Sequence, residues 1–204
     1  MARACFQDEA GNLYVKEIKL LSLTDQFLIA MPDLQDPSFY KSVTYLCQHD
    51  EQGGLGVVIN QPLAMSFTEL FSALDIDLID TSIGSRAVLS GGPVSLNQGF
   101  VLHTNTDIKW EHSLVINEHL SLSSSKDILE SIAIGEGPEE FLILLGYSGW
   151  SEGQLEKEIL ENSWLTHPSD NDIIFNIPLK ERWQAAANLM GFDINLISKQ
   201  IGHA

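Results

Sequence analysis

The chain has 204 residues, a length that suits one substantial domain rather than two, and its 44% hydrophobic and 19% charged residues are typical of a soluble globular protein. Its 28 acidic and 11 basic residues give a net charge of −17, and so negative a surface repels the phosphate groups of nucleic acids. There is neither a basic stripe nor an apolar run of membrane-spanning length. We therefore expect no direct binding to nucleic acid and no membrane insertion.

The start of the chain differs from the remainder. Residues 1–22 are weakly patterned, and they predict either a loosely attached arm or a short strand at 13–18 added to the edge of a sheet. Their charges exclude the apolar core of a signal peptide, and the two cysteines, Cys5 and Cys47, cannot form a disulfide framework. A cytoplasmic protein is expected, with one domain over 23–204.

Beyond residue 22, short apolar runs bounded by turn residues predict strands, and amphipathic segments that follow a capping residue or a proline predict helices. In chain order these are strands at 27–30, 43–47 and 55–59, a helix from 66, strands at 87–89, 99–103 and 114–116, a helix at 125–134, a strand at 141–145, a helix at 151–161, a strand at 173–175, a helix at 178–191 and a short helix at 195–200. This mixture indicates an α+β fold, a single domain with about four helices packed on a mixed, largely antiparallel sheet.

Local signals support several of these elements. Ser66 and Glu69 have the spacing of a capping box, in which the two side chains satisfy free backbone N–H groups at the start of a helix. The polar connector 49–54 predicts a hairpin between the second and third strands. Gly135 is placed to cap the helix at 125–134, and Pro178 suits the first position of a helix.

The segment around Ser148 is similar to the nucleophile elbow of serine hydrolases, in which a serine stands between two glycines on a sharp turn. Gly146 fits this pattern, but Trp150 occupies the place of the second glycine. No later histidine stands in a distinctive motif. We therefore interpret the segment as a tight turn with Trp150 in the core, and predict no catalytic residue there.

A second candidate is Cys47 with His49, since residues two apart on a strand point to the same face. His103 could complete a metal site of the Cys/His type. A cysteine within an apolar strand is more typical of a small buried hydrophobe. We accordingly predict neither a metal nor a cofactor.

Two glycine-rich turns, 53–56 and 91–93, are followed by strand patterns rather than helices, so neither is expected to cradle a phosphate. The second turn is nevertheless dense in special residues, as functional loops often are. The predicted ligand- or partner-binding residues are Asn60, Pro62, Gly91, Gly92, Pro93 and His103. The acidic pairs on the helices, Glu158 with Glu161 among them, are interpreted as solvated surface.

Several ordered motifs together resemble the YqgE/AlgH family of bacterial proteins over about residues 23–203. They are FLIAMP at 27–32, SVTYLCQH at 42–49, GVVINQP at 56–62, SGGPV at 90–94, GFVLH at 99–103 and LGYSGWSEGQLE at 145–156. One departure is Gln61, where the family usually has a basic residue. The resemblance implies a coiled or bifurcated sheet. It supplies no catalytic residue, and Ser148 is often alanine in the family.

The favoured hypothesis from these observations is a cytoplasmic, non-enzymatic regulatory domain that binds protein partners and has room for a small ligand. The alternative is a small-ligand-binding protein or an enzyme that uses the loops around Asn60, 91–93 and His103. A transcriptional regulator, the label that the family often carries, is less favoured because no DNA-reading motif is present.

Overall fold

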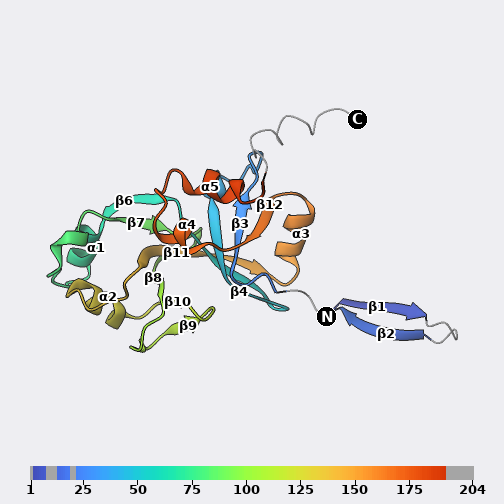
Figure 1. The fold of residues 1–204 in the computed structure, drawn as a ribbon, viewed down its shortest axis with the longest axis horizontal. Helices are drawn as coiled ribbons and strands as arrows, with labels where there is room; N and C mark the ends of the chain where they lie inside the picture. The colour runs from blue at the N-terminus through green and yellow to red at the C-terminus, as the bar shows by residue number, and fades with distance from the viewer. Residues whose placement is uncertain (1, 8–12, 19–21, 192–204) are drawn as a thin grey trace.

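The computed structural model describes residues 2–7, 13–18 and 22–191 (Figure 1). Strands β1 (Ala2–Gln7) and β2 (Leu13–Ile18) pair antiparallel with each other and do not belong to the main sheet. The strand expected at 13–18 is therefore present, but its partner is β1 and not a sheet edge. The helix expected at 195–200 lies outside the described residues.

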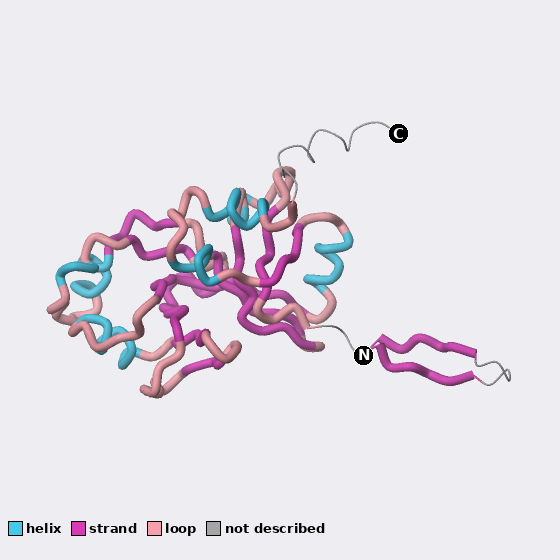
Figure 2. The backbone as a smooth tube through the Cα atoms, in the orientation of Figure 1, coloured by secondary structure: helices cyan, strands magenta, loops and turns pink. Residues whose placement is uncertain are grey.

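Ten strands form a curled sheet that is antiparallel except where β7 runs parallel to β11 (Figure 2). Their order is β12-β3-β4-β5-β11-β8-β10-β9, and the pair β6–β7 joins at β11. The strands are β3 (Gln26–Ala30), β4 (Val43–Asp50), β5 (Gly53–Val58), β6 (Pro62–Ser66), β7 (Ala87–Ser90), β8 (Val94–Thr104), β9 (Ser113–Val115), β10 (Leu120–Ser123), β11 (Phe141–Ser151) and β12 (Trp164–Pro168). The α+β prediction is confirmed.

Helices cover both faces of the sheet, and this explains why its strands are continuous apolar runs. Along β11, Leu142 and Leu144 pack in the core beneath α4 and α5, whereas Phe141 and Ile143 pack beneath α1 and α2. Helix α3 lies on the same face as α1 and α2, over the other end of the sheet (Figure 1). The helices are α1 (Phe67–Ala73), α2 (Lys126–Ala133), α3 (Gln154–Leu160), α4 (Asn171–Phe175) and α5 (Arg182–Asn188), with short 3-10 turns η1 (Pro37–Phe39) and η2 (Thr81–Ile83).

The capping box that predicted α1 is confirmed. The Ser66 hydroxyl accepts a hydrogen bond from the backbone N–H of Glu69, and the Glu69 carboxylate accepts one from the backbone N–H of Ser66. The hairpin of β4 and β5 is also present, although both strands are longer than expected and only residues 51 and 52 remain between them.

The main correction concerns β11. It continues through Ser151, so the segment expected to be a tight turn is a strand that pairs with β5 over 148–151. Gly146 is not a turn residue but a bulge in this strand, with φ of +75°. Because of this continuation α3 begins only at Gln154, after Gly153 in the left-handed conformation. Trp150 is buried as expected.

The region after β12 also differs from expectation. Residues 173–175 lie in helix α4, because the Asp170 carboxylate accepts hydrogen bonds from the N–H groups of Asp172 and Ile173 and caps a helix there. Helix α5 begins at Arg182, after Pro178, and carries Trp183 into the core. The structure thus has five helices in its described part. Strands β6, β10 and β12 had no expected counterpart.

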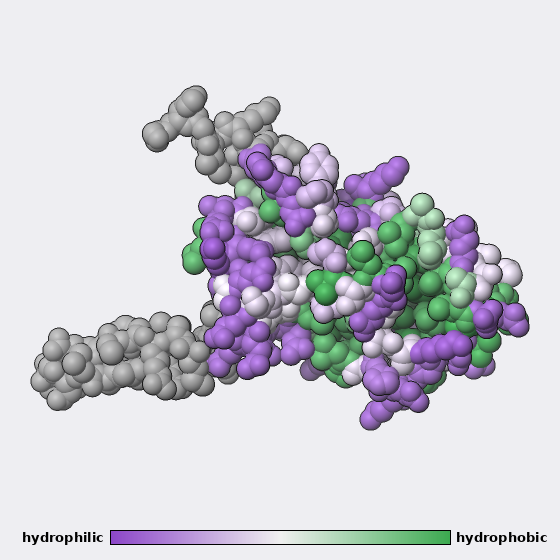
Figure 3. Space-filling view, turned by 180° about the vertical axis from the view of Figure 1, so that it is seen from behind, coloured by the Kyte–Doolittle hydropathy of each residue, from purple (hydrophilic) through white to green (hydrophobic). Residues whose placement is uncertain are grey.

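The surface differs between the two ends of the molecule. Seen from behind, hydrophilic residues gather on the half near α3, and hydrophobic residues gather on the half that holds α1 and α2 (Figure 3). Leu74, Ile79 and Ile134 are exposed at that second end. None of the helices in the described residues is long and apolar enough to cross a membrane.

Candidate functional site

The predicted binding residues lie in separate places. Asn60 and Pro62 line one groove, of about 620 Å³, whereas His103 lines a different pocket, of about 390 Å³. We call these the Asn60 groove and the His103 pocket. The Asn60 groove is lined by Tyr40, Lys41, Asn60, Gln61, Pro62, Leu179, Lys180, Trp183 and Gln184. The six predicted residues therefore do not share one cleft.

Three separate segments build the Asn60 groove: the residues after η1, the connection from β5 to β6, and the start of α5. Asn60 holds the first two together. Its side-chain oxygen accepts a hydrogen bond from the N–H of Val43 at 2.9 Å, and its side-chain nitrogen donates one to the carbonyl oxygen of Lys41, also at 2.9 Å. Lys41 has φ of +49°, which is uncommon for a residue with a side chain. Asn60 thus fixes the backbone from which the Lys41 side chain extends.

Two lysines give the Asn60 groove its charge. The Lys41 ammonium lies 5.2 Å from the ring centre of Trp183 and 5.7 Å from that of Tyr40, distances at which a cation is attracted to an aromatic face. Neither Lys41 nor Lys180 forms an ion pair within the part of the chain that the structure describes. By contrast, Lys126 and Lys157 on the helices each pair with a glutamate one turn away.

A third cation is buried next to the groove. Arg182 is 3% exposed and donates hydrogen bonds to the carbonyl oxygens of Ile177 and Ile59, at 2.9 and 2.6 Å. Burial, and next the charge of Arg86, lower the pKa of Arg182 to about 10, so it remains a cation near neutral pH. No carboxylate among the described residues pairs with it. The groove therefore concentrates positive charge on a strongly acidic protein.

Gly91 and Gly92 are buried in backbone packing. The Gly91 N–H donates to the carbonyl oxygen of Leu145, and the Gly91 carbonyl accepts from the N–H of Val58. At Gly92 a Cβ atom would lie 2.3 Å from the Ser148 hydroxyl oxygen. The glycines that attracted attention in the sequence are thus required for close contact of β11 with its neighbours. Pro93 is exposed beside them, outside both cavities.

Cys47 and His49 do not meet, because a bulge in β4 between Leu46 and Gln48 separates their surroundings. Cys47 lies in the core, where burial, and next the charge of Asp25, raise the pKa of its thiol well above the ordinary value. This opposes thiolate chemistry. Among the described residues, no three His, Cys, Asp or Glu side chains lie close enough to share a metal ion.

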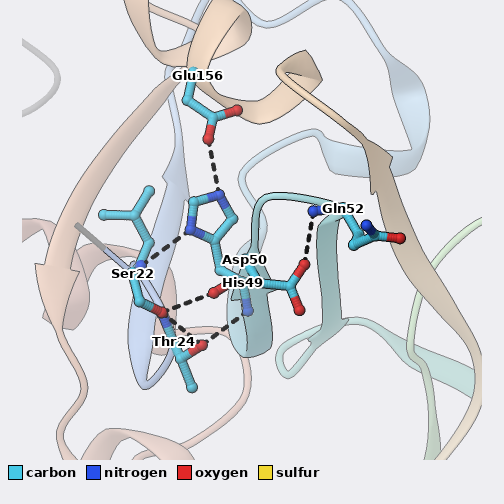
Figure 4. Close-up of polar contacts among 7 residues, drawn as sticks. Ser22, Thr24, His49, Asp50, Gln52 and Glu156 are labelled. Carbon is cyan, nitrogen blue, oxygen red and sulfur yellow. Dashed lines mark hydrogen bonds and ion pairs between the residues drawn. The ribbon is translucent and has the colours of Figure 1, made fainter. Parts of the chain in front are cut away.

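His49 instead forms hydrogen bonds with residues 22–24, which precede β3. Its Nδ1 accepts a hydrogen bond from the N–H of Leu23 at 3.1 Å, so the proton on the ring is at Nε2, which faces the Glu156 carboxylate at 3.0 Å (Figure 4). The backbone of His49 also bonds the hydroxyls of Ser22 and Thr24. These contacts tie residues 22–24 to β4 and α3. The sequence patterns did not predict the contacts of His49 with residues 22–24 or with Glu156.

The other residues that sequence reasoning missed are the cations of the groove and Glu158. Lys41 and Lys180 are far apart in the chain, and no motif links them. Glu158 was interpreted as solvated, but one of its carboxylate oxygens accepts hydrogen bonds from the buried indoles of Trp150 and Trp164, at 2.9 and 2.8 Å. An acidic residue six positions before a tryptophan carries no sequence signal for such a contact.

Comparison with known proteins agrees with this fold. The profile of the AlgH-like family matches residues 27–195. A UPF0301 protein of Methylococcus capsulatus is 48% identical over 181 residues, which cover 89% of this chain and 96% of that protein. The solution structure of the AlgH protein from Pseudomonas aeruginosa is similar with a TM-score of 0.73 and 43% identity, over 93% of this chain and 100% of that one. A crystal structure from Corynebacterium diphtheriae, 17% identical over 89% of this chain and 94% of that one, shares the fold with a TM-score of 0.68. The chain belongs to the AlgH-like family.

Proposed function

We propose that this protein is a cytoplasmic regulatory domain that acts by binding, and that a partner protein places an acidic segment in the Asn60 groove. The observation that carries the proposal is the pair Lys41 and Lys180. Both lie in one concave surface without a carboxylate partner among the described residues, on a chain of net charge −17.

Charge selects the occupant. An acidic segment is repelled by most of this surface and attracted to the groove, so the field of the protein both steers the encounter and selects the site. The buried charge of Arg182 next to the groove adds to this attraction. A neutral or basic segment would gain nothing from these cations.

Tyr40 adds contact area to the groove, since it is 61% exposed. Trp183 is 5% exposed, and its ring supports the Lys41 ammonium from the core. Tyrosine and tryptophan are enriched at binding hot spots, because they combine large apolar area with a polar atom. A volume of about 620 Å³ is large enough to receive several side chains of a bound segment.

The lining also favours binding over catalysis. It contains no serine, threonine, cysteine, histidine or carboxylate, so the Lys41 and Lys180 amines and the Tyr40 phenol are the groups of this lining left for a nucleophile or a base.

Charge reversal tests the proposal. The double variant Lys41→Glu, Lys180→Glu is compared with Lys126→Glu, Lys157→Glu, which changes the net charge equally on distant, exposed helices. In affinity purification from the native cells, we expect a partner that is retained by the wild type and by the helix variant and lost from the groove variant. An identical set of partners for all three proteins would refute the proposal.

A second arm distinguishes protein from small-molecule occupants. The purified wild type is screened by thermal shift against carboxylate and phosphate metabolites, since a ligand that binds only the folded state raises its apparent stability. Stabilisation by one such anion that the groove variant lacks would assign the Asn60 groove to a small ligand, and the protein-binding proposal would then be wrong.

A further inference from the structure

A chain of three hydrogen-bonded side chains lies in the His103 pocket, apart from the Asn60 groove. His103 on β8 contacts Ser123 on β10, with 2.8 Å between its Nε2 and the serine Oγ. The Ser123 Oγ in turn lies 2.7 Å from the Oγ of Ser113 on β9. The other ring nitrogen of His103, Nδ1, lies 2.8 Å from the carbonyl oxygen of Thr104.

The position of each proton follows from these partners. A carbonyl oxygen only accepts, so Nδ1 carries the ring proton and Nε2 is the acceptor. Ser123 then donates its one proton to Nε2, and its oxygen can only accept a proton from Ser113. The carbonyl oxygen of Trp110 is a second acceptor for Ser113, but at 3.2 Å it is the longer contact. The Ser113 hydroxyl therefore donates to Ser123, and the Ser123 hydroxyl donates to His103.

The three hydrogen-bonded side chains differ in burial. His103 is 2% exposed and Ser123 is fully buried, whereas Ser113 is exposed and lines the pocket. The ring of Trp110 packs edge-on against His103, with 5.0 Å between ring centres. Burial lowers the pKa of His103, which keeps the ring neutral and able to accept a proton near neutral pH. A base in the interior is thus connected to a hydroxyl at the surface.

We propose that Ser113 is a nucleophile for acyl transfer from small activated esters or thioesters, and that Ser123 and His103 relay its proton. The Ser113 oxygen attacks the acyl carbonyl, its proton passes to Ser123, and the Ser123 proton passes to His103 Nε2. When the bond to the leaving group breaks, the Ser113 oxygen is part of the new ester, so the proton passes from His103 through Ser123 directly to the leaving alkoxide or thiolate. A water molecule then attacks the acyl-serine, and its proton passes through Ser123 to His103 Nε2. The same proton returns through Ser123 to the Ser113 oxygen as the acid leaves.

The pocket also indicates what substrate it would accept. Its charged lining residues are Lys109 and Glu111, both exposed, and Lys109 forms no ion pair among the described residues. Ile108 and Val115 supply apolar walls, 51% and 69% exposed. Glu111 likewise forms no ion pair among these residues, so the charges of the lining balance, and the pocket suits a short acyl chain attached to a polar group.

The test uses a fluorophosphonate probe, which forms a covalent bond with activated serines, on the purified full chain. Intact mass and peptide mapping should show one phosphonyl group added to the wild type, on Ser113. The Ser113→Ala variant should carry none. Labelling should be at least 10-fold slower in Ser123→Ala and in His103→Asn. The control is Ser72→Ala on α1, an exposed serine outside the pocket, and its labelling should equal that of the wild type.

The pH profile separates a relay from a structural role. The labelling rate should fall on acidification below the ordinary pKa range of histidine, as His103 becomes protonated, and stay level above it. The charged residues around this assembly are Lys109 and Glu111 in the pocket lining, Asp127, whose carboxylate accepts from the Glu111 N–H, and Glu140, whose carbonyl oxygen accepts from the Thr104 N–H. Absence of label on Ser113 in the folded wild type, or equally fast labelling of folded Ser123→Ala, overturns the proposal. Labelling should be unaffected by charge reversal at the Asn60 groove, so the two proposals fail independently.

Discussion

Replacing Glu158 with alanine removes the single acceptor that two buried tryptophans share. Trp150 and Trp164 are 6% and 3% exposed, and both indole N–H groups donate to the same carboxylate oxygen. A buried donor without an acceptor costs about 1–3 kcal/mol, and hydrogen bonds to charged groups are at the upper end of this range. Because Glu158 is half-buried and water can replace part of what is lost, we expect the free energy of unfolding to fall by about 2–4 kcal/mol.

Urea denaturation followed by tryptophan fluorescence measures this change. The matched control is Glu161→Ala at the C-terminal cap of the same helix. The ion pair of Glu161 with Lys157 is exposed, with 3.7 Å between the charged atoms, and contributes less than about 0.5 kcal/mol. Glu158→Gln retains an oxygen acceptor and should lose about half as much as the alanine variant. Equal stabilities for Glu158→Ala and Glu161→Ala would refute the reasoning that the carboxylate holds the two indoles.

Three further predictions concern stability. Ser66→Ala removes one half of the capping box, and the free energy of unfolding measured in urea should fall by about 1 kcal/mol. Gly92→Ala places a Cβ within 2.4 Å of the Tyr147 backbone at φ of +147°, so the same measurement should show a loss of more than about 3 kcal/mol, and a loss below 1 kcal/mol would contradict the packing described. Burial lowers the pKa of His103 in the folded state, so the unfolded state binds more protons as the pH falls through the ordinary histidine value of 6.5. Thermal melting temperatures should therefore decrease below that pH, and less steeply in a His103→Gln variant.

Much of the fold followed from the local pattern of residues. Continuous apolar runs mark the strands because both faces of the sheet are covered, and the cap at Ser66 is a signal contained within four residues. The error at β11 has a physical cause: Gly146 resembles a turn residue, but its positive φ accommodates a bulge against Gly92, which is far away in the sequence. Such a contact exists only after the strands have paired.

The functional site was less predictable for the same reason. Asn60 and His103 are in motifs and were identified as candidates, yet their cavities are completed by residues from distant segments. Lys41 and Lys180 approach one groove only because α5 packs on β3 and β4. Ser113 acquires a partner only because β9 pairs with β10. Single residues were found from sequence, and their combinations required the structure.

Photocrosslinking at Tyr40 tests the central claim, that the Asn60 groove receives an acidic protein segment. A photoreactive phenylalanine analogue replaces Tyr40 in the groove or, as control, Leu160 on α3, which is 82% exposed and lies elsewhere. In living cells we expect a crosslinked partner at position 40 only, its attached peptide rich in Asp or Glu, and loss of the product in the Lys41→Glu, Lys180→Glu background. A product that survives this charge reversal, or one that forms equally at position 160, would contradict the claim.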